Sequence, residues 1–235
     1  MRPDACGICL LKQTASGAQS VTSPSKIVGF REFEADLSAL FLPGIRKKLE
    51  KYFHEKNIGS LLALYPTPVT VIGAMNKEKP TWTLVAHVGI IGHDRVLVSL
   101  ATPHFINGII KEKQKLSINM VTEEMLPEVD LSGALSGTKN DKSGLFEYEV
   151  GENGTPIISK APLTMECTVT DIYETNGFES FICTIDGTYV EQKYLDDSGK
   201  PDYHTMKPVL FQFPSYEYLK TGEVIGKCLS FKKSE

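Results

Sequence analysis

Residues 65–119 read YPTPVTVIGAMNKEKPTWTLVAHVGIIGHDRVLVSLATPHFINGIIKEKQKLSIN, and this stretch decides the fold. It holds three short runs rich in β-branched and aliphatic residues, at residues 69–75, 82–91 and 95–101. Runs of this length and composition predict β-strands. A parallel crossover needs about a dozen residues, more than either connection offers, so the three runs predict an antiparallel meander.

The second and third predicted strands differ in how their side chains alternate. In the third, Val96 and Val98 alternate with Arg95 and Ser99, so one face is dry and the other is polar. The second, at residues 82–91, is mostly apolar on both faces. This pattern is typical of a strand that is buried on both sides, or that a ligand or a second subunit covers.

A helix is predicted directly after the third strand. Thr102 suits the N-cap, Pro103 suits the first helical position, and the helix is expected to run to about Lys113. Its core-facing residues are expected to be Phe105, Ile109 and Ile110. The free N–H groups of a helix N-terminus suit an anion such as a phosphate, and His104 could add a donor. The alternative is an ordinary capped helix without a ligand.

The β pattern continues to the C-terminal end. Apolar and polar residues alternate on both sides of Asn176-Gly177, which predicts a long hairpin closed by a type I′ turn. The other expected elements are a strand at 116–121, a short helix at 122–125, a polar loop at 132–143, a strand at 209–213 and a last short strand near Leu229. Roughly eight strands and few helices predict a mainly β, antiparallel Greek-key barrel with peripheral helices.

The N-terminal part differs in composition from this barrel. Residues 1–28 are rich in Ser, Thr, Gly and Gln, and predict a flexible tail. Residues 29–60 carry two amphipathic stripes and predict a helical N-terminal extension. Residues 61–235 are then the barrel domain. No signal-peptide pattern is recognised, so a cytoplasmic location is expected.

Composition excludes several classes of protein. The formal net charge of -4 argues against nucleic-acid binding. The sequence contains no run of 18 apolar residues, so no membrane span is expected. The five cysteines are an odd number, as expected for reduced cysteines in a cytosolic protein. Cys6 and Cys9 form a CxxC, but no second pair or histidine pair completes a zinc site.

Motifs for side-chain catalysis are missing from the sequence. It has no G-x-S-x-G, HExxH, GxGxxG or P-loop pattern, and its five histidines do not show metal-ligand spacing. We therefore expect no catalytic side chain, and if the protein is an enzyme, a cofactor carries the chemistry.

Seven segments resemble the flavin reductase-like, or flavoredoxin-like, family of FMN-binding split barrels. In order they are YPTPVTVIG, KPTWTLVAHVGI, VLVSLATPHF, KLSIN, SG followed by DKS, GTPII with APLTMEC, and YLKTGEVIGKCLS. The resemblance covers about residues 62–231. Each segment is weakly specific alone, but their common order is specific.

The resemblance implies a homodimer with FMN at the subunit interface. Contacts to the isoalloxazine and ribityl chain are implied for Trp82, Thr83, Ala86, His87 and Val88. The phosphate end is implied to lie near Ser99, Ala101, His104 and Asn107, and the loop that closes over the flavin is implied to include Lys142 and Ser143. Many relatives have Asn at the position of Thr81, Trp at that of His87 and Arg at that of His104.

The implied function is an FMN-binding oxidoreductase that takes electrons from NAD(P)H or another donor. A nicotinamide-binding fingerprint is absent, so NAD(P)H would bind transiently against the flavin. The main alternative is a non-catalytic flavin-binding electron carrier served by a donor protein. A third is a split barrel that has lost its cofactor.

Overall fold

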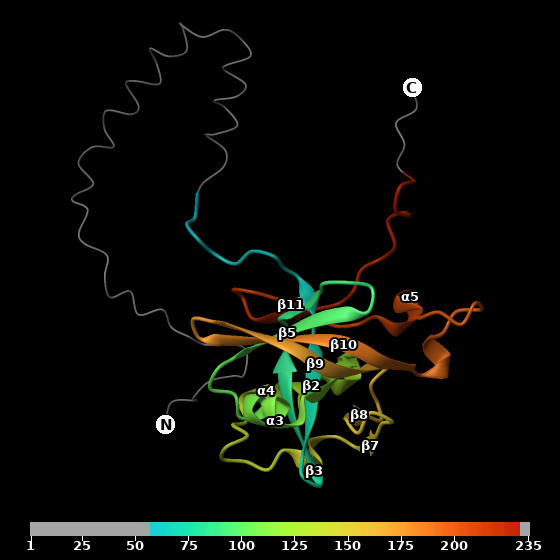
Figure 1. The fold of residues 1–235 in the computed structure, drawn as a ribbon. Helices are drawn as coiled ribbons and strands as arrows, with labels where there is room; N and C mark the ends of the chain where they lie inside the picture. Colours follow the sequence, from blue (N-terminus) through green and yellow to red (C-terminus); the bar gives the residue numbers. More distant parts are fainter. Residues whose placement is uncertain (1–56, 231–235) are drawn as a thin grey trace, which may run out of the picture. The chain divides into compact units, whose positions relative to one another are not determined.

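The computed structural model describes residues 57–230 (Figure 1). Residues 64–230 belong to one structural unit, and residues 57–63 belong to a second one. The predicted tail at 1–28, the Cys6–Cys9 pair and nearly all of the predicted helical extension at 29–60 therefore lie outside the described residues.

The unit is mainly β and is built on one seven-stranded antiparallel sheet (Figure 1). In spatial order its strands are β3 (Lys79–Val85), β2 (Thr70–Asn76), β6 (Lys115–Met120), β9 (Leu163–Thr175), β10 (Phe178–Val190), β5 (Arg95–Ala101) and β4 (Val88–Ile90). The predicted meander and the long Asn176-Gly177 hairpin are both present, as the β2–β3, β4–β5 and β9–β10 pairs. The predicted type I′ turn is wrong, because it needs positive φ at both central residues and only Gly177 has it.

The sheet has to curl because its two edge strands are neighbours in sequence. β3 and β4 are separated only by Ala86-His87, a link that reaches about 10 Å. A flat sheet of seven strands at about 4.8 Å spacing would hold its edges about 29 Å apart. Curling brings the edges together and produces the predicted split barrel. The prediction of a single strand at residues 82–91 is thus wrong. The strand is interrupted at Ala86-His87, where the chain passes from β3 at one edge of the sheet to β4 at the other.

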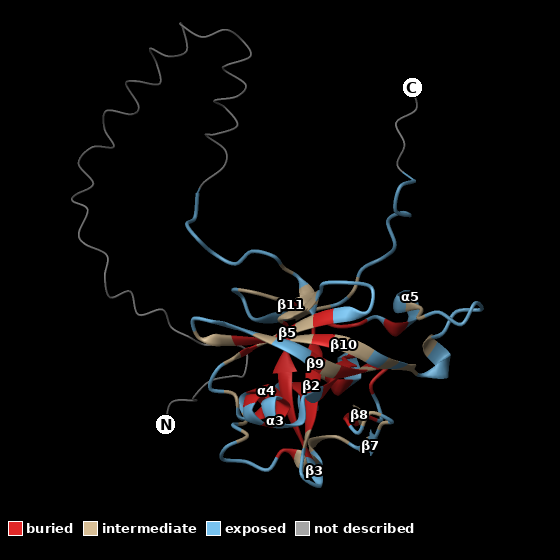
Figure 2. Ribbon diagram, viewed as in Figure 1, coloured by how far each residue is buried: buried red, intermediate tan, exposed pale blue. Residues whose placement is uncertain are grey.

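Two hydrophobic cores explain why β2 and β3 are apolar on both faces. Ile72 of β2 and Val85 of β3 lie in the first core, whereas Val71 and Leu84 lie in the second. Figure 2 shows that β2 is buried along most of its length. The prediction that residues 82–91 are covered on both sides is confirmed for residues 82–85 of β3, whereas Ile90 and Ile91 are exposed.

Two helices pack on these strands. Helix α3 (Phe105–Lys113) contributes Ile106, Ile109 and Ile110 to the first core. Helix α4 (Leu126–Ala134) follows the short helix η2 (Glu123–Met125), and Pro127 in its first turn removes no internal hydrogen bond. Val129 of α4 packs in the second core.

The start of α3 corrects the prediction for this helix. The N-cap is His104, two residues after the expected Thr102, and Thr102-Pro103 form a turn instead. One consequence concerns Phe105, which was expected in the core. It becomes the first helical residue, and its side chain is 39% exposed.

Short elements complete the unit. They are β1 (Thr67–Pro68), β11 (Leu210–Gln212) and β12 (Glu217–Leu219) in one small sheet, β7 (Tyr148–Val150) and β8 (Pro156–Ile158) in another, and the helices η3 (Ser143–Leu145), η4 (Gln192–Tyr194) and α5 (Tyr203–Met206). The strand expected near Leu229 is wrong, because the described residues after β12 contain no further strand. Leu229 is 89% exposed, so no packing holds a strand there.

Candidate functional site

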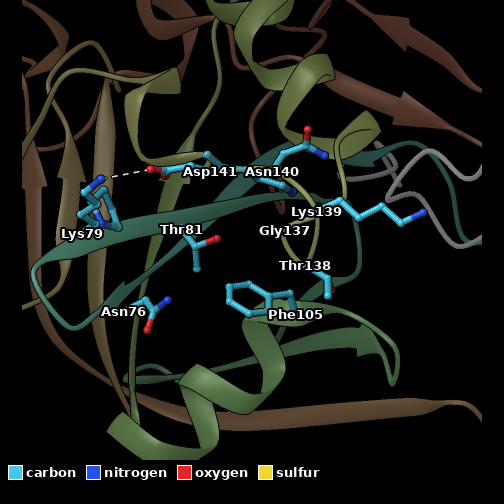
Figure 3. Close-up of a pocket in the computed structure, with 11 residues that line it drawn as sticks. Asn76, Lys79, Thr81, Phe105, Gly137, Thr138, Lys139, Asn140 and Asp141 are labelled. Carbon is cyan, nitrogen blue, oxygen red and sulfur yellow. Dashed lines mark hydrogen bonds and ion pairs between the residues drawn. The ribbon is translucent and has the colours of Figure 1, made fainter.

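A cavity of about 330 Å³ lies where the β2–β3 turn, the start of α3 and the loop at residues 137–142 meet. Its volume falls within the range of small-molecule sites. Figure 3 shows Thr81 of β3 and Phe105 of α3 facing each other across it. Gly137 allows the loop to lie flat against Phe105, since an added Cβ would come within 2.9 Å of the ring.

The alternation of β3 decides which of its residues face this side. Thr81 and Thr83 share one face, and both are buried. The Thr83 hydroxyl has no hydrogen-bond partner among the described residues. Trp82 points to the opposite face, where its ring packs edge-on against Phe146 and Tyr148. The two threonines therefore offer hydroxyls on the face where the cavity lies, whereas Trp82 belongs to the second core.

Lys142 is the most informative residue of the cavity wall. Its side chain is buried, and its Nζ donates to the carbonyl oxygens of Trp82 at 3.0 Å and Ser132 at 2.7 Å. Ser132 lies in the last turn of α4, where carbonyls lack helical partners and carry a partial negative charge. An ammonium group has three N–H donors, so one remains for a ligand.

The charge of Lys142 is not balanced by an acid in the described part of the chain. No ion pair is formed by its Nζ, because the neighbouring Asp141 instead binds Lys79 at 3.1 Å (Figure 3). Hydrogen bonds from Ser143 and Lys79 hold the pKa of Asp141 at about 2. Burial lowers the pKa of Lys142 to about 8, so the group is still mainly ammonium at pH 7. The cavity wall thus holds a buried cation without a carboxylate.

His104 adds a second polar group beside Lys142. It caps α3 through its backbone, and its side chain makes no capping hydrogen bond. Burial and the nearby charge of Lys142 lower the pKa of His104 below its ordinary value, so the imidazole is neutral at pH 7. The first N–H groups of α3 lack acceptors within the helix and carry a partial positive charge. Lys142, His104 and the α3 N-terminus together favour an anionic ligand.

A second group of the predicted residues lies around His87, outside the cavity lining. The His87 Nε2 atom is 3.0 Å from the Tyr65 hydroxyl oxygen, and its ring centroid is 6.0 Å from that of Phe178. The His87 carbonyl accepts the backbone N–H of Ser99 at 2.9 Å. The Ser99 and Ser180 hydroxyl oxygens lie 2.7 Å apart. Ala86 and Val88 flank His87 at the junction of the two sheet edges.

Asn107 and Ala101 are joined to the framework that holds α3. The Asn107 Nδ2 atom donates to the Ala101 carbonyl at 3.1 Å and to Glu179 Oε2 at 2.7 Å. Lys111 donates to the other oxygen of Glu179. This buried clasp fixes the start of the helix relative to β5 and β10, and thereby positions His104. The sequence reasoning missed Glu179, because its partners are 68 and 72 residues away.

The predicted residues therefore do not all meet in one place. Lys142 lines the cavity and His104 lies close to it, whereas Ala86, His87, Val88 and Ser99 form the junction of the sheet edges. Ser143 begins η3 and donates its backbone N–H to Asp141 Oδ1 at 2.9 Å. The cavity residues that were not singled out include Thr81 and Gly137. The sequence signals for Gly137 were its place in the SG segment of the resemblance and in the loop predicted at 132–143. The start of that loop was predicted too early, because residues 132–134 belong to α4.

The buried thiols of Cys167 and Cys183 are expected to be unreactive in the folded protein. Both lie in the first core, and burial is the main cause that raises the pKa of each thiol, to about 12 for Cys183. Because the thiolate is the reactive form, iodoacetamide at pH 8 is expected to label the exposed Cys228 ~100-fold faster. Mass spectrometry of peptides measures each site separately. Equal labelling of Cys183 and Cys228 before unfolding would contradict the expected protection.

Two further features are absent from residues 57–230. No group of three or more His, Cys, Asp or Glu side chains is arranged to hold a metal ion in this part of the chain. Within the same residues, no helix has the length and apolar character needed to span a membrane.

Comparison with known proteins agrees with this architecture. The sequence profile described as Flavin reductase like domain matches residues 62–220. Flavoredoxin from Methanosarcina acetivorans is 32% identical with a TM-score of 0.72, and the similarity covers 76% of this chain and 97% of that one. Flavoredoxin of Desulfovibrio vulgaris (Miyazaki F) is 27% identical with a TM-score of 0.70, covering 75% of this chain and 98% of that one.

More distant structures share the fold. An FMN-binding protein from Thermus thermophilus, determined with bound 1-cyclohex-2-enone, is 20% identical with a TM-score of 0.63, and the similarity covers 74% of this chain and 98% of that one. No curated protein matches the sequence significantly.

Fold and site define a split barrel with a cationic small-molecule cavity beside its β3 edge. The profile match covers residues 62–220, and one solved relative is 32% identical over nearly its whole length. The chain belongs to the flavin reductase-like family. This membership supports a flavin-related redox function.

Proposed function

We propose that the protein is an FMN-binding oxidoreductase that passes electrons from NAD(P)H or another donor to flavin. The observation that carries the proposal is the buried Lys142 ammonium, which has no carboxylate partner in the described residues and lies in a cavity beside the α3 N-terminus. A phosphate-bearing cofactor supplies the negative charge that such a site favours.

The residues present fit a flavin in three respects. Lys142, His104 and the first N–H groups of α3 would hold an anionic part of the cofactor. Thr81 and Thr83 would offer hydroxyls, one of which is buried and unpartnered in the described structure. Phe105 would supply an apolar wall. When bound, FMN supplies the two-electron and one-electron chemistry that the side chains themselves lack.

The protein's own contribution would be binding, orientation and electrostatics. The Asn107–Glu179–Lys111 clasp holds the start of α3, and the Lys79–Asp141 pair joins the loop at 137–142 to β3. The first contact is formed mainly by buried groups, whereas the second is an exposed ion pair and contributes little. No side chain of the cavity needs to act as an acid or a base, consistent with the absence of a catalytic motif.

An electron carrier is the second candidate function. Two solved relatives, 32% and 27% identical, are named flavoredoxin rather than reductase. A carrier of this kind would bind flavin equally well but would accept electrons from a protein donor and react slowly with NAD(P)H. The enzyme is the first candidate because the exposed Lys79 and Lys139 line the cavity, and their positive charges favour an anionic nucleotide.

We further propose a homodimer with flavin at the subunit interface. Support comes from apolar side chains that are left exposed next to an open sheet edge. Ile90 is 88% exposed and Ile91 is 51% exposed, and β4 has no strand on its outer side among the described residues. A second copy would bury them. A cytoplasmic location is proposed from the free buried cysteines Cys167 and Cys183.

The visible absorption spectrum after incubation with FMN and gel filtration tests the proposed function. Flavin bands that co-elute at about one flavin per chain are the expected result. Anaerobic addition of NADH or NADPH then separates the candidates, since rapid bleaching supports the enzyme and no bleaching supports the carrier. A protein that binds FMN neither tightly nor weakly in a fluorescence titration would overturn both.

A further inference from the structure

Lys142 is an unusual cation because its surroundings do not neutralise it. Its side chain is 6% exposed, and its two acceptors are the uncharged carbonyls of Trp82 and Ser132. Burial of a charge without a paired opposite charge is unfavourable, so the amine gives up its proton more readily than a surface lysine. The position of Lys142 in the wall of the cavity means that an entering ligand can change this balance.

We propose that Lys142 is a proton-linked anion switch: an anionic group in the cavity holds the lysine in its ammonium form, and loss of that proton releases the anion. The inference rests on the proposed function, because it concerns the same cavity. It goes beyond that function by assigning a coupling between ligand binding and proton uptake to one residue.

The other charged groups around the cavity are ion-paired or exposed, so Lys142 is the group whose protonation an anion in the cavity would change. From the loop, Asp141 is already paired with Lys79 of β3, and Lys139 is exposed. From α4, Glu128 and Asp130 are exposed, and Asp130 accepts a hydrogen bond from the Tyr218 hydroxyl at 2.8 Å. None of these groups makes an ion pair with Lys142.

His104 faces Lys142 from the start of α3 and titrates in a different range. Its pKa is lowered by burial and by Lys142, so it is neutral throughout pH 7 to 9. An anion would also favour protonation of His104, but only at lower pH. A coupling observed between pH 7 and 9 therefore reports on Lys142.

Binding of the anion and uptake of the proton are linked one to one. Above the titration range of the free site, the amine is neutral, and binding of an anion takes one proton from solvent to form the ammonium–anion pair. Below that range the proton is already present and none is taken up. Burial lowers the pKa of Lys142 to about 8, so the ammonium fraction of the free protein falls about tenfold from pH 7 to pH 9. Affinity for the anion is expected to fall by the same factor.

Two parts of FMN have oxygen atoms that can accept hydrogen bonds from the ammonium, and only one of them is anionic at pH 7. One is the phosphate, which carries close to two charges above pH 7. The other is the carbonyl-bearing edge of the flavin ring. Riboflavin lacks the phosphate but keeps the ring, so a comparison of the two flavins distinguishes these sources.

The experiment uses the full chain and measures Kd for FMN and for riboflavin at pH 7, 8 and 9 by flavin fluorescence. Isothermal titration at pH 9 in two buffers with different ionisation enthalpies gives the number of protons taken up. The expected results are an FMN affinity about tenfold weaker at pH 9 than at pH 7 and an uptake of close to one proton. If only FMN shows this dependence, the phosphate is the anion; if riboflavin shows it equally, the ammonium binds the uncharged ring carbonyls and the anion switch is overturned.

The variant Lys142→Arg separates the switch from other effects of pH. Arginine keeps its charge at pH 9, so its FMN affinity is expected to be the same at pH 7 and pH 9. The control Lys160→Arg, at an exposed position away from the cavity, is expected to keep the tenfold dependence. If the larger arginine does not fit the site, the number of protons that the unmodified protein takes up on binding FMN still tests the switch.

The outcomes distinguish the switch from the function it rests on. FMN that binds with the same affinity at pH 7 and 9, without proton uptake, overturns the switch and leaves the flavin site intact. A pH dependence that survives in Lys142→Arg also overturns it. Failure of both flavins to bind at every pH overturns the proposed function together with the switch.

Discussion

Replacing Lys142 with glutamine is expected to weaken FMN binding about 100-fold at pH 7. Glutamine keeps an N–H donor for the carbonyls of Trp82 and Ser132 but removes the positive charge. Hydrogen bonds to charged groups contribute about 1.5 to 3 kcal/mol, and each 1.4 kcal/mol is about tenfold in Kd. The effect is large because the described residues offer no other buried ammonium in the cavity.

Fluorescence titration of FMN against Lys142→Gln measures this change in Kd. Lys160→Gln is the matched control, since it removes the same charge from an exposed site outside the cavity. The control is expected to change Kd by less than about twofold, because charges in water are screened. An unchanged Kd in Lys142→Gln would show that the ligand does not contact this ammonium.

Replacing Gly73 with alanine is expected to lower the free energy of unfolding by about 2 to 4 kcal/mol. A Cβ at this position would lie 2.5 Å from one ring carbon of Trp82 and 2.7 Å from the Ser117 hydroxyl oxygen. Both neighbours are fully buried, so neither side chain can move aside without disturbing the second core or β6. Chemical denaturation of the flavin-free protein, followed by circular dichroism, measures the loss.

Gly108 provides the matched control for this substitution. It lies in the exposed face of α3, and an added Cβ would meet nothing within 4 Å. Gly108→Ala is therefore expected to raise the free energy of unfolding by about 0.5 to 1 kcal/mol, as alanine restricts the unfolded chain. If Gly73→Ala behaves like Gly108→Ala, the close packing of Gly73 against Trp82 is refuted.

A double-mutant cycle locates the clash. Trp82→Phe shortens the ring system that faces Gly73, so Gly73→Ala is expected to cost less in that background than in the natural protein. Equal costs in both backgrounds would place the strain elsewhere, for example at Ser117.

Much of the fold could be predicted from local patterns. The alternation at residues 163–189 and the glycine at position 177 specify β9 and β10, because period-two patterning and a positive-φ glycine act over a few residues. The apolar runs at 69–75 and 95–101 likewise specify β2 and β5. The order of seven weak segments indicated the flavin reductase-like family, which the match over residues 62–220 confirms.

Predictions that depended on distant contacts were less successful. Residues 82–91 read as one strand, yet the chain leaves one edge of the sheet at Val85 and joins the other at Val88. Local propensity is similar on both sides of the break, so only closure of the barrel decides its position. The start of α3 shifted to His104 for a similar reason, since the Thr102 N–H bonds the Gly177 carbonyl across the sheet.

The sequence by itself determined the mainly β class, the strand pairing of the hairpins and the family, because each depends on patterns within short segments. Only the tertiary structure decided which residues meet in the cavity. Lys142 resembles any loop lysine in the sequence, and it becomes a buried cation only when Trp82 and Ser132, 60 and 10 residues away, bring their carbonyls to its Nζ. Burial and the distance between charges determine what an ionisable group does, and both are properties of the folded chain.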